Sequence, residues 1–131
     1  MTGFIEQNPE FKGRDLYITG ESYAGHFIPA ISSYYIKQEA QPMNLKGIAI
    51  GNGWTDPYDE YPGYATFSRE NKLVSEHHYY LLEGLYKICQ VLIEEGHTLI
   101  AQVVCEITTQ TIHGNPFGTP TFNVFDIRKA C

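Results

Sequence analysis

The chain has 131 residues, a formal net charge of −6 at pH 7, ten tyrosines and seven phenylalanines. This length suits one modest domain, and the aromatic content suits a packed protein instead of a disordered one. The acidic balance argues against a nucleic-acid partner because no basic patch exists to meet phosphates. No apolar run approaches the ~20 residues that span a membrane, and the first residues lack the basic region and apolar core of a signal peptide.

The first elements are predicted from short apolar runs and the residues that end them. Residues 1–8 are expected to be the end of a helix, which Asn8-Pro9 terminates. A polar loop follows over residues 9–15. Residues 16–19 are a short apolar run with turn signals on both sides, which is typical of a buried parallel strand.

The next stretch, Gly20-Glu21-Ser22-Tyr23-Ala24-Gly25, has the layout of a nucleophile elbow. In an elbow a strained turn between strand and helix exposes a serine hydroxyl, and the helix N-terminus favours developing negative charge. The strict pattern is Gly-x-Ser-x-Gly. Ala24 replaces the second glycine here, and we interpret the sequence as a variant because alanine is small enough for the turn.

A helix and a second strand are expected after the serine. The helix should end at Gln41-Pro42, and Pro29 should kink it or restart it. Its apolar face is predicted to comprise Phe27, Ile28, Ile31 and Tyr35. Residues 45–51 form the next strand, which completes a right-handed βαβ unit with the elbow at the carboxyl end of a strand, where open α/β sheets place their sites.

The second half of the chain is predicted to be mainly helical. Residues 52–57 form a turn-rich loop, and residues 75–95 form the clearest helix, with Ser75 as N-cap and Gly96 just beyond the C-terminus. Residues 98–110 have helical spacing at positions 100, 103, 104 and 107, although their β-branched residues favour a strand; we expect a helix. Residues 114–120 are expected to be a loop.

Eleven residues from Gly20 to Ala30 closely resemble the active-site stretch of the serine carboxypeptidases, a family with the α/β-hydrolase fold. Residues 52–57 and 123–131 resemble two further signatures of that family. The resemblance implies an α/β protein with a partial α/β-hydrolase fold. Residues 1–57 would be part of the hydrolase core and residues 58–131 a helical cap insertion. It also implies a longer complete enzyme, so we expect this chain to be an internal fragment.

The same resemblance implies an activity and a set of site residues. A serine carboxypeptidase releases C-terminal amino acids from peptides with a free C-terminus, through an acyl-enzyme on the residue that matches Ser22. The backbone N–H of Tyr23 would be one oxyanion donor, and Glu21 would hold the substrate's C-terminal carboxylate. Three aromatic residues would line the pocket for the side chain before the scissile bond, unless they pack in the core: Trp54, Tyr61 and Tyr64. Serine acyl transfer requires no metal or organic cofactor.

A catalytic base and acid for Ser22 are not evident in the sequence. His26 lies one helical turn beyond the serine, on the wrong side of an elbow to take its proton. Asp56 follows the second strand, where some α/β hydrolases place the triad acid, but no convincing histidine accompanies it. In the family both residues come from beyond the insertion, so we expect them to be missing here and the isolated chain to be inactive. Asp126 belongs to a structural signature and is given no catalytic role.

Other readings of the chain remain open at the sequence level. It could belong to an acyltransferase of the same fold, in which a hydroxyl acceptor replaces water, or it could be a non-catalytic truncated product. Three cysteines, Cys89, Cys105 and Cys131, match no zinc spacing. Because the family is secreted or vacuolar-lysosomal and carries disulfides, we expect bridges, with Cys131 pairing beyond residue 131.

Overall fold

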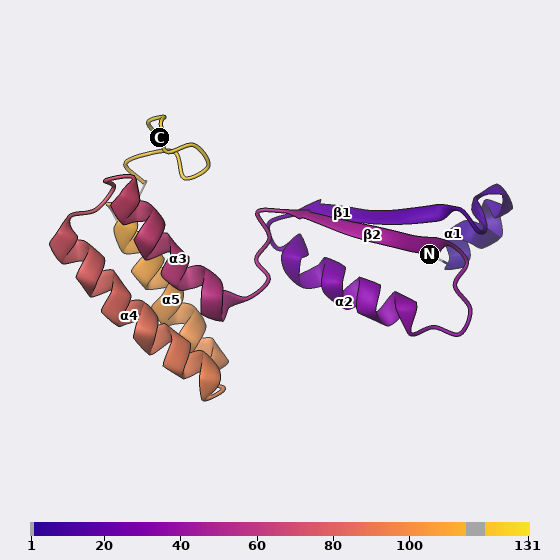
Figure 1. Cartoon of the computed structure of the whole chain (residues 1–131), viewed down its shortest axis with the longest axis horizontal. Coiled ribbons are helices and arrows are strands. Elements are labelled where there is room, and N and C mark those ends of the chain that lie inside the picture. The colour runs from indigo at the N-terminus through magenta and orange to yellow at the C-terminus, as the bar shows by residue number, and fades with distance from the viewer. Residues whose placement is uncertain (1, 115–119) are drawn as a thin grey trace. The chain divides into compact units, whose positions relative to one another are not determined.

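The computed structural model describes residues 2–114 and 120–131. They form two compact units, Met1–Thr55 (unit 1) and Asp56–Cys131 (unit 2), whose elements are labelled in Figure 1. None of the helices in the described ranges is long and apolar enough to cross a membrane. The loop predicted over residues 114–120 falls largely on residues 115–119, which lie outside the described part.

Unit 1 is a βαβ unit preceded by a short helical segment. Helix α1 (Thr2–Gln7) and the 3-10 turn η1 (Pro9–Phe11) lead into strand β1 (Asp15–Glu21), helix α2 (Ala24–Ile36) and strand β2 (Asn44–Gly51). The strands pair in parallel from Asp15 opposite Asn44 to Glu21 opposite Gly51, with one irregularity between Leu16 and Tyr17. Helix α2 lies along the two-stranded sheet (Figure 1). The predicted βαβ unit is therefore confirmed.

Helix α2 packs through a different set of residues from the one predicted. Its buried residues are Gly25, Ile28, Ser32 and Tyr35. Phe27 and Ile31 are 55% and 51% exposed, so the prediction was right for two of its four apolar contacts and wrong for these two.

Pro29 does not divide α2 into two helices. It is the sixth residue of a helix that continues to Ile36, so of the two expected outcomes, a kink or a restart, the restart does not occur. Near the C-terminal end of α2, the Tyr35 hydroxyl donates to the Met43 carbonyl at 2.8 Å and accepts from the Met43 N–H at 2.9 Å. These two bonds fix the return of the chain from α2 towards β2.

Unit 2 consists of three helices and a C-terminal segment: α3 (Pro57–Glu70), α4 (Glu76–Glu94) and α5 (Thr98–Ile112). Helix α4 agrees with its predicted signals, because Ser75 Oγ accepts the His78 N–H at 3.2 Å and Gly96 has φ +77°. Residues 98–110 are helical as expected. The buried face of α5 comprises Ala101, Cys105, Thr108 and Ile112, whereas the apolar residues at 100, 103 and 107 are exposed.

A disulfide and aromatic side chains hold the three helices together. Cys89 of α4 and Cys105 of α5 are bonded, with their Cα atoms 5.5 Å apart, and both are almost fully buried. Cys131 is free and exposed. The Tyr86 ring stacks on Tyr61 of α3 at 6.1 Å, and burial raises the pKa of Tyr86 to about 12. The expected bridging of cysteines thus holds for one pair within unit 2.

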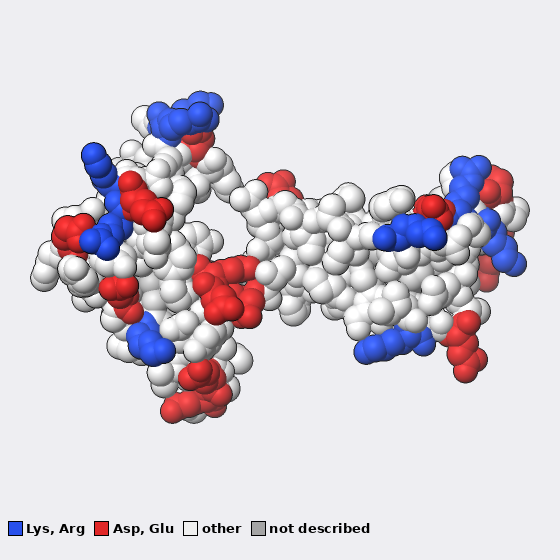
Figure 2. All heavy atoms as spheres, viewed as in Figure 1, with Lys and Arg blue, Asp and Glu red and all other residues white. Residues whose placement is uncertain are grey.

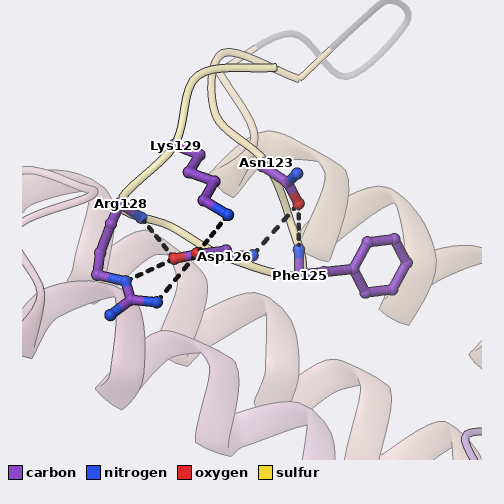
Figure 3. A network of polar contacts seen from close by, with 5 residues as sticks. All are labelled: Asn123, Phe125, Asp126, Arg128 and Lys129. Carbon is purple, nitrogen blue, oxygen red and sulfur yellow. Dashed lines mark hydrogen bonds and ion pairs between the residues drawn. The ribbon is translucent and has the colours of Figure 1, made fainter.

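The C-terminal segment contains a turn braced by polar contacts (Figure 3). The Asn123 Oδ1 atom accepts the backbone N–H groups of Phe125 and Asp126 at 2.9 and 3.2 Å. The Asp126 carboxylate accepts two bonds from the Arg128 guanidinium, at 2.7 and 3.0 Å, and lies 3.5 Å from the Lys129 ammonium. The contacts of Asp126 are therefore those expected of a residue that stabilises a turn.

Candidate active site

The backbone at Ser22 is held in a conformation that residues other than glycine rarely adopt. Ser22 directly follows β1 and has φ +58°, in the left-handed region, which carries strain and is found at functional sites. Its N–H donates to the Gly51 carbonyl at the end of β2, at 3.1 Å. Its side chain is exposed. The chain thus makes a sharp turn between strand and helix with the serine on the outside.

The carbonyl of Ser22 ties the turn to both neighbouring segments. It accepts the N–H of Gly25, in the first turn of α2, at 3.0 Å, and the N–H of Trp54, in the loop after β2, at 2.9 Å. Two hydrogen bonds on one carbonyl fix the peptide plane after the serine. They offset the local strain and hold Ser22 at the carboxyl ends of β1 and β2.

Two glycines allow the close contacts around this turn. A Cβ on Gly20 would lie 2.6 Å from the Ala24 Cβ and 2.9 Å from the Ile28 Cδ1, so a side chain there would push α2 away from β1. A Cβ on Gly25 would lie 2.6 Å from the Trp54 backbone nitrogen. The glycines of the motif therefore serve packing, as the elbow interpretation requires.

Glu21 is the last residue of β1 and is exposed. Residues 16–36 contain no other Asp, Glu, Lys or Arg, and residues 47–55 contain none. Figure 2 shows the same distribution, with the blue and red atoms of unit 1 gathered mainly where the strands begin. In the described part of unit 1, Lys46 lies 3.9 Å from Asp15 and no Lys or Arg pairs with Glu21.

Tyr23 begins the helix that follows the serine. It is the N-cap residue of α2, and a helix has no internal acceptor for the N–H at that position. Its side chain is 47% exposed, with its ring 5.3 Å from Trp54 and 5.5 Å from His26. The Tyr23 N–H therefore lies beside the Ser22 side chain at the positive end of a helix, where a developing oxyanion is favoured.

The three predicted pocket residues fall in different environments. Trp54 belongs to unit 1 and is half-buried. Tyr61 and Tyr64 belong to α3 in unit 2, where Tyr61 is 4% exposed and Tyr64 is 45% exposed. The Tyr61 hydroxyl donates to Glu106 Oε1 at 2.9 Å, and burial together with this bond raises the Tyr61 pKa well above its ordinary value. Tyr61 thus offers little of its own surface to a ligand.

The weaker triad candidates have structural contacts. The Asp56 side chain caps α3 by accepting the Tyr58 N–H at 3.1 Å. The His26 ring lies 5.5 Å from Tyr23 and 5.8 Å from Phe27. Of the five histidines, His26 alone belongs to the same unit as Ser22. The expectation that the base and acid of Ser22 lie outside this chain remains a prediction.

One residue with a contact to this set was not identified from the sequence. Glu106, in α5, accepts the Tyr61 hydroxyl although the two lie 45 positions apart. No motif or local spacing marks it. The one feature of the sequence that could have drawn attention to Glu106 is its charge, because α5 is otherwise largely apolar.

Comparison with known proteins gives one consistent family. The model of the serine carboxypeptidase family matches residues 1–131. Serine carboxypeptidase-like 47 from Arabidopsis thaliana is 37% identical over the whole chain, which covers 27% of that protein. A Dictyostelium discoideum serine carboxypeptidase S10 family member is 36% identical, again over the whole chain and 31% of the relative.

A fungal relative and a solved structure agree with this result. The pheromone-processing carboxypeptidase kex1 of Aspergillus oryzae is 38% identical over 95% of this chain and 21% of its own length. The crystal structure of Kex1(delta)p, a prohormone-processing carboxypeptidase from Saccharomyces cerevisiae, matches with a TM-score of 0.78 and 26% identity, over 98% of this chain and 30% of that one. The chain therefore spans less than a third of the length of each of these relatives.

Proposed function

This chain belongs to the serine carboxypeptidase family and has part of the α/β-hydrolase fold, and we propose that the protein carrying it releases C-terminal amino acids from peptides. The reaction would proceed through an acyl-enzyme on Ser22. The single observation that carries this proposal is the exposed Ser22 at φ +58°, between the end of β1 and the start of α2. A serine held outside such a turn is the nucleophile of acyl-transfer enzymes on this fold.

The chemical step needs groups beyond the serine. Ser22 attacks the scissile carbonyl after losing its proton to a histidine base, which an acid orients, and both are expected from outside these 131 residues. The Tyr23 N–H would donate to the oxyanion that forms, and the helix N-terminus would favour its charge. In this arrangement unit 1 supplies the nucleophile and one oxyanion donor.

Glu21 would anchor the substrate's C-terminal carboxylate. Two carboxyl groups attract one another when one of them carries a proton, because its O–H donates to the other. The absence of Lys and Arg from residues 16–36 and 47–55 supports this role, since a nearby cation would otherwise pair with Glu21. Binding of peptides should then weaken as the pH rises and the shared proton is lost, and hydrolysis should be best in acid.

The remaining assignments concern the substrate pocket and the setting of the enzyme. Trp54 and Tyr64 would line the pocket for the side chain before the scissile bond, and Tyr61 would support Tyr64 from within unit 2. Residues 1–57 would belong to the hydrolase core and residues 58–131 to its cap. The enzyme would be secreted or vacuolar-lysosomal, and a disulfide between Cys89 and Cys105 suits such an oxidising compartment.

The test uses the complete natural protein that carries this chain and measures release of the C-terminal amino acid from a blocked dipeptide. We expect Ser22→Ala to abolish release. Glu21→Gln should flatten the loss of affinity at high pH for peptides with a free carboxylate, with much less change for esters and amides. Wild-type rates in Ser22→Ala would refute the proposal. Transfer of the acyl group to an added alcohol, in place of hydrolysis, would identify an acyltransferase instead.

A further inference from the structure

Asn52 leaves the sheet beside Ser22 and has the same unusual backbone conformation. Glu21 and Gly51 are partners in the parallel register, so Ser22 and Asn52 are the next residues of two neighbouring strands. Asn52 has φ +44° and Ser22 has φ +58°. In the described part of unit 1 these are the two non-glycine residues with positive φ. Such strained residues cluster at functional sites, which makes Asn52 a candidate for a role in the site of Ser22.

Hydrogen bonds on both sides of Asn52 fix its place relative to the serine. The Gly51 carbonyl accepts the Ser22 N–H at 3.1 Å, and the Trp54 N–H donates to the Ser22 carbonyl at 2.9 Å. The residue before Asn52 and the residue two beyond it are therefore both bonded to Ser22. The exposed Asn52 side chain thus begins at a backbone position that is held beside the nucleophile.

The Asn52 amide differs from the other asparagine side chains that the structure describes. Four of these bond to nearby backbone groups: Asn8, Asn44, Asn71 and Asn123. Among the described residues, Asn52 makes no such bond, so its amide does not brace its own loop. An amide has two N–H donors and an acceptor oxygen. Those of Asn52 can therefore bond a group from a part of the protein beyond the described residues.

The acid that orients the catalytic histidine is expected on the side of Ser22 where Asn52 lies. In α/β hydrolases the catalytic residues follow one another along the chain as serine, acid and histidine. Consecutive parallel strands are usually neighbours, so the strand after β2 would join the edge of β2 that pairs with no described strand. Sites in such sheets lie at the carboxyl ends of the strands. An acid at the end of that strand would face Ser22 across Asn52.

We propose that Asn52 is a positioning residue of the catalytic triad, whose side-chain N–H donates to the carboxylate of the acid and holds it beside the histidine. This inference rests on the proposed function, in which that acid orients the base of Ser22. A neutral amide can fix a carboxylate without adding charge to the site, and a hydrogen bond to an ionised group is stronger than one between neutral groups. Asn52 thus acts on Ser22 through the acid and the histidine.

Asn52→Gly separates the amide from the backbone conformation. Glycine adopts positive φ without strain, so the variant keeps the turn and loses only the side chain. In the complete natural protein we expect kcat for a blocked dipeptide to fall roughly tenfold, with KM unchanged within twofold and the unfolding midpoint unchanged or raised. The matched control is Lys72→Gly, because Lys72 is a non-glycine residue with φ +58° between α3 and α4. It should keep the wild-type kcat.

Asn52→Asp keeps the shape of the side chain and its tolerance of positive φ, but it places a second carboxylate beside the triad. The added negative charge favours the imidazolium and raises the histidine pKa, so the acid limb of kcat/KM should move up by about one pH unit. The other titratable residues near the elbow in unit 1, Glu21, Tyr23 and His26, are the same in both proteins. A residue that served only the turn would accept glycine or aspartate with the wild-type kcat and pH profile.

The outcomes separate this inference from the function on which it rests. Wild-type kcat in Asn52→Gly, a raised KM without a change in kcat, or an unmoved pH profile in Asn52→Asp would overturn the inference while Ser22-dependent hydrolysis upheld the function. Lower kcat together with lower stability in Asn52→Gly would make Asn52 a structural residue and would overturn it too. Failure of the wild type to hydrolyse the dipeptide would refute both.

Discussion

The elbow should depend on the absence of a side chain at Gly25. A Cβ there would lie 2.6 Å from the Trp54 nitrogen, 2.8 Å from the Trp54 oxygen and 2.9 Å from the Gly53 carbonyl carbon. All three are backbone atoms, so no side chain can rotate away to make room. Ordinary contact begins at 3.4 Å, and Gly25→Ala must therefore move the loop after β2 by about 0.8 Å.

This displacement acts on the nucleophile through one hydrogen bond. The Trp54 N–H donates to the Ser22 carbonyl at 2.9 Å, and a shift of that size takes the bond beyond its working range. Ser22 would lose one of the two bonds that fix its peptide. Because a misplacement of ~1 Å can cost ~10²-fold in rate, we expect kcat/KM to fall about 100-fold, mostly through kcat. Overpacking should also cost about 1–3 kcal/mol of stability.

The assay is blocked-dipeptide hydrolysis by the complete natural protein, together with denaturant unfolding. Gly84→Ala is the matched control, since a Cβ at Gly84 in α4 meets nothing within 4 Å. It should leave activity unchanged and add roughly 0.5–1 kcal/mol of stability, because alanine is the better helix residue. If Gly25→Ala kept wild-type kcat/KM, the bond between Trp54 and Ser22 would not position the nucleophile.

Three further predictions concern the rest of the chain. Replacing Cys89 and Cys105 with alanine should lower the free energy of unfolding by about 3 kcal/mol, from loop entropy over a separation of 16 residues; an unchanged free energy in denaturant unfolding would contradict this. Hydrogen bonds from Arg128 lower the pKa of Asp126 below its ordinary 3.8, so the turn's stabilisation should be complete above pH 3.8 and lost as the pH falls through the lowered value; protection factors of the amides of residues 123–129 that already fall on acidification to pH 6 would argue against it. The isolated 131-residue chain should show no Ser22-dependent hydrolysis, because its base and acid are expected elsewhere; turnover that Ser22→Ala abolishes would reveal an internal base.

The elements around the elbow were predictable because their signals are local. The apolar run at 16–19, the glycines beside Ser22 and the strand at 45–51 each lie within a few residues of the structure they specify. The same holds for α4, whose start at Ser75 and end near Gly96 follow from capping alone. These features require no knowledge of distant contacts.

Helix α3 was not predicted, although its start carries a recognisable signal. Asp56 is an N-cap, Pro57 occupies the first helical turn and Asp59 lies in that turn, which is the usual pattern for a helix beginning. Pro62 lies inside this helix, where a proline argues against a continuous helix. Pro62 has no N–H to donate to the Tyr58 carbonyl, which accepts from Gln90 Nε2 at 3.0 Å instead.

The buried faces of α2 and α5 could not be chosen from hydrophobicity. Each helix has two apolar or small-residue faces, and the more hydrophobic one is exposed in both: Phe27 and Ile31 in α2, and Ile100, Val103 and Ile107 in α5. The buried faces contain Gly25 and Ala101 instead. The contact of Tyr61 with Glu106 could not be predicted from the sequence either, because it depends on how α3 packs against α5.

The most direct test of the central claim is covalent labelling of the nucleophile. The complete natural protein is treated with a fluorophosphonate, digested with trypsin and analysed by fragmentation of the peptide from Asp15 to Lys37. This peptide also contains Ser32 and Ser33, which serve as internal controls. We predict that the phosphonate is found on Ser22 alone and that peptidase activity is lost in proportion to labelling. Loss of activity with Ser22 unmodified would contradict the assignment of Ser22 as the nucleophile.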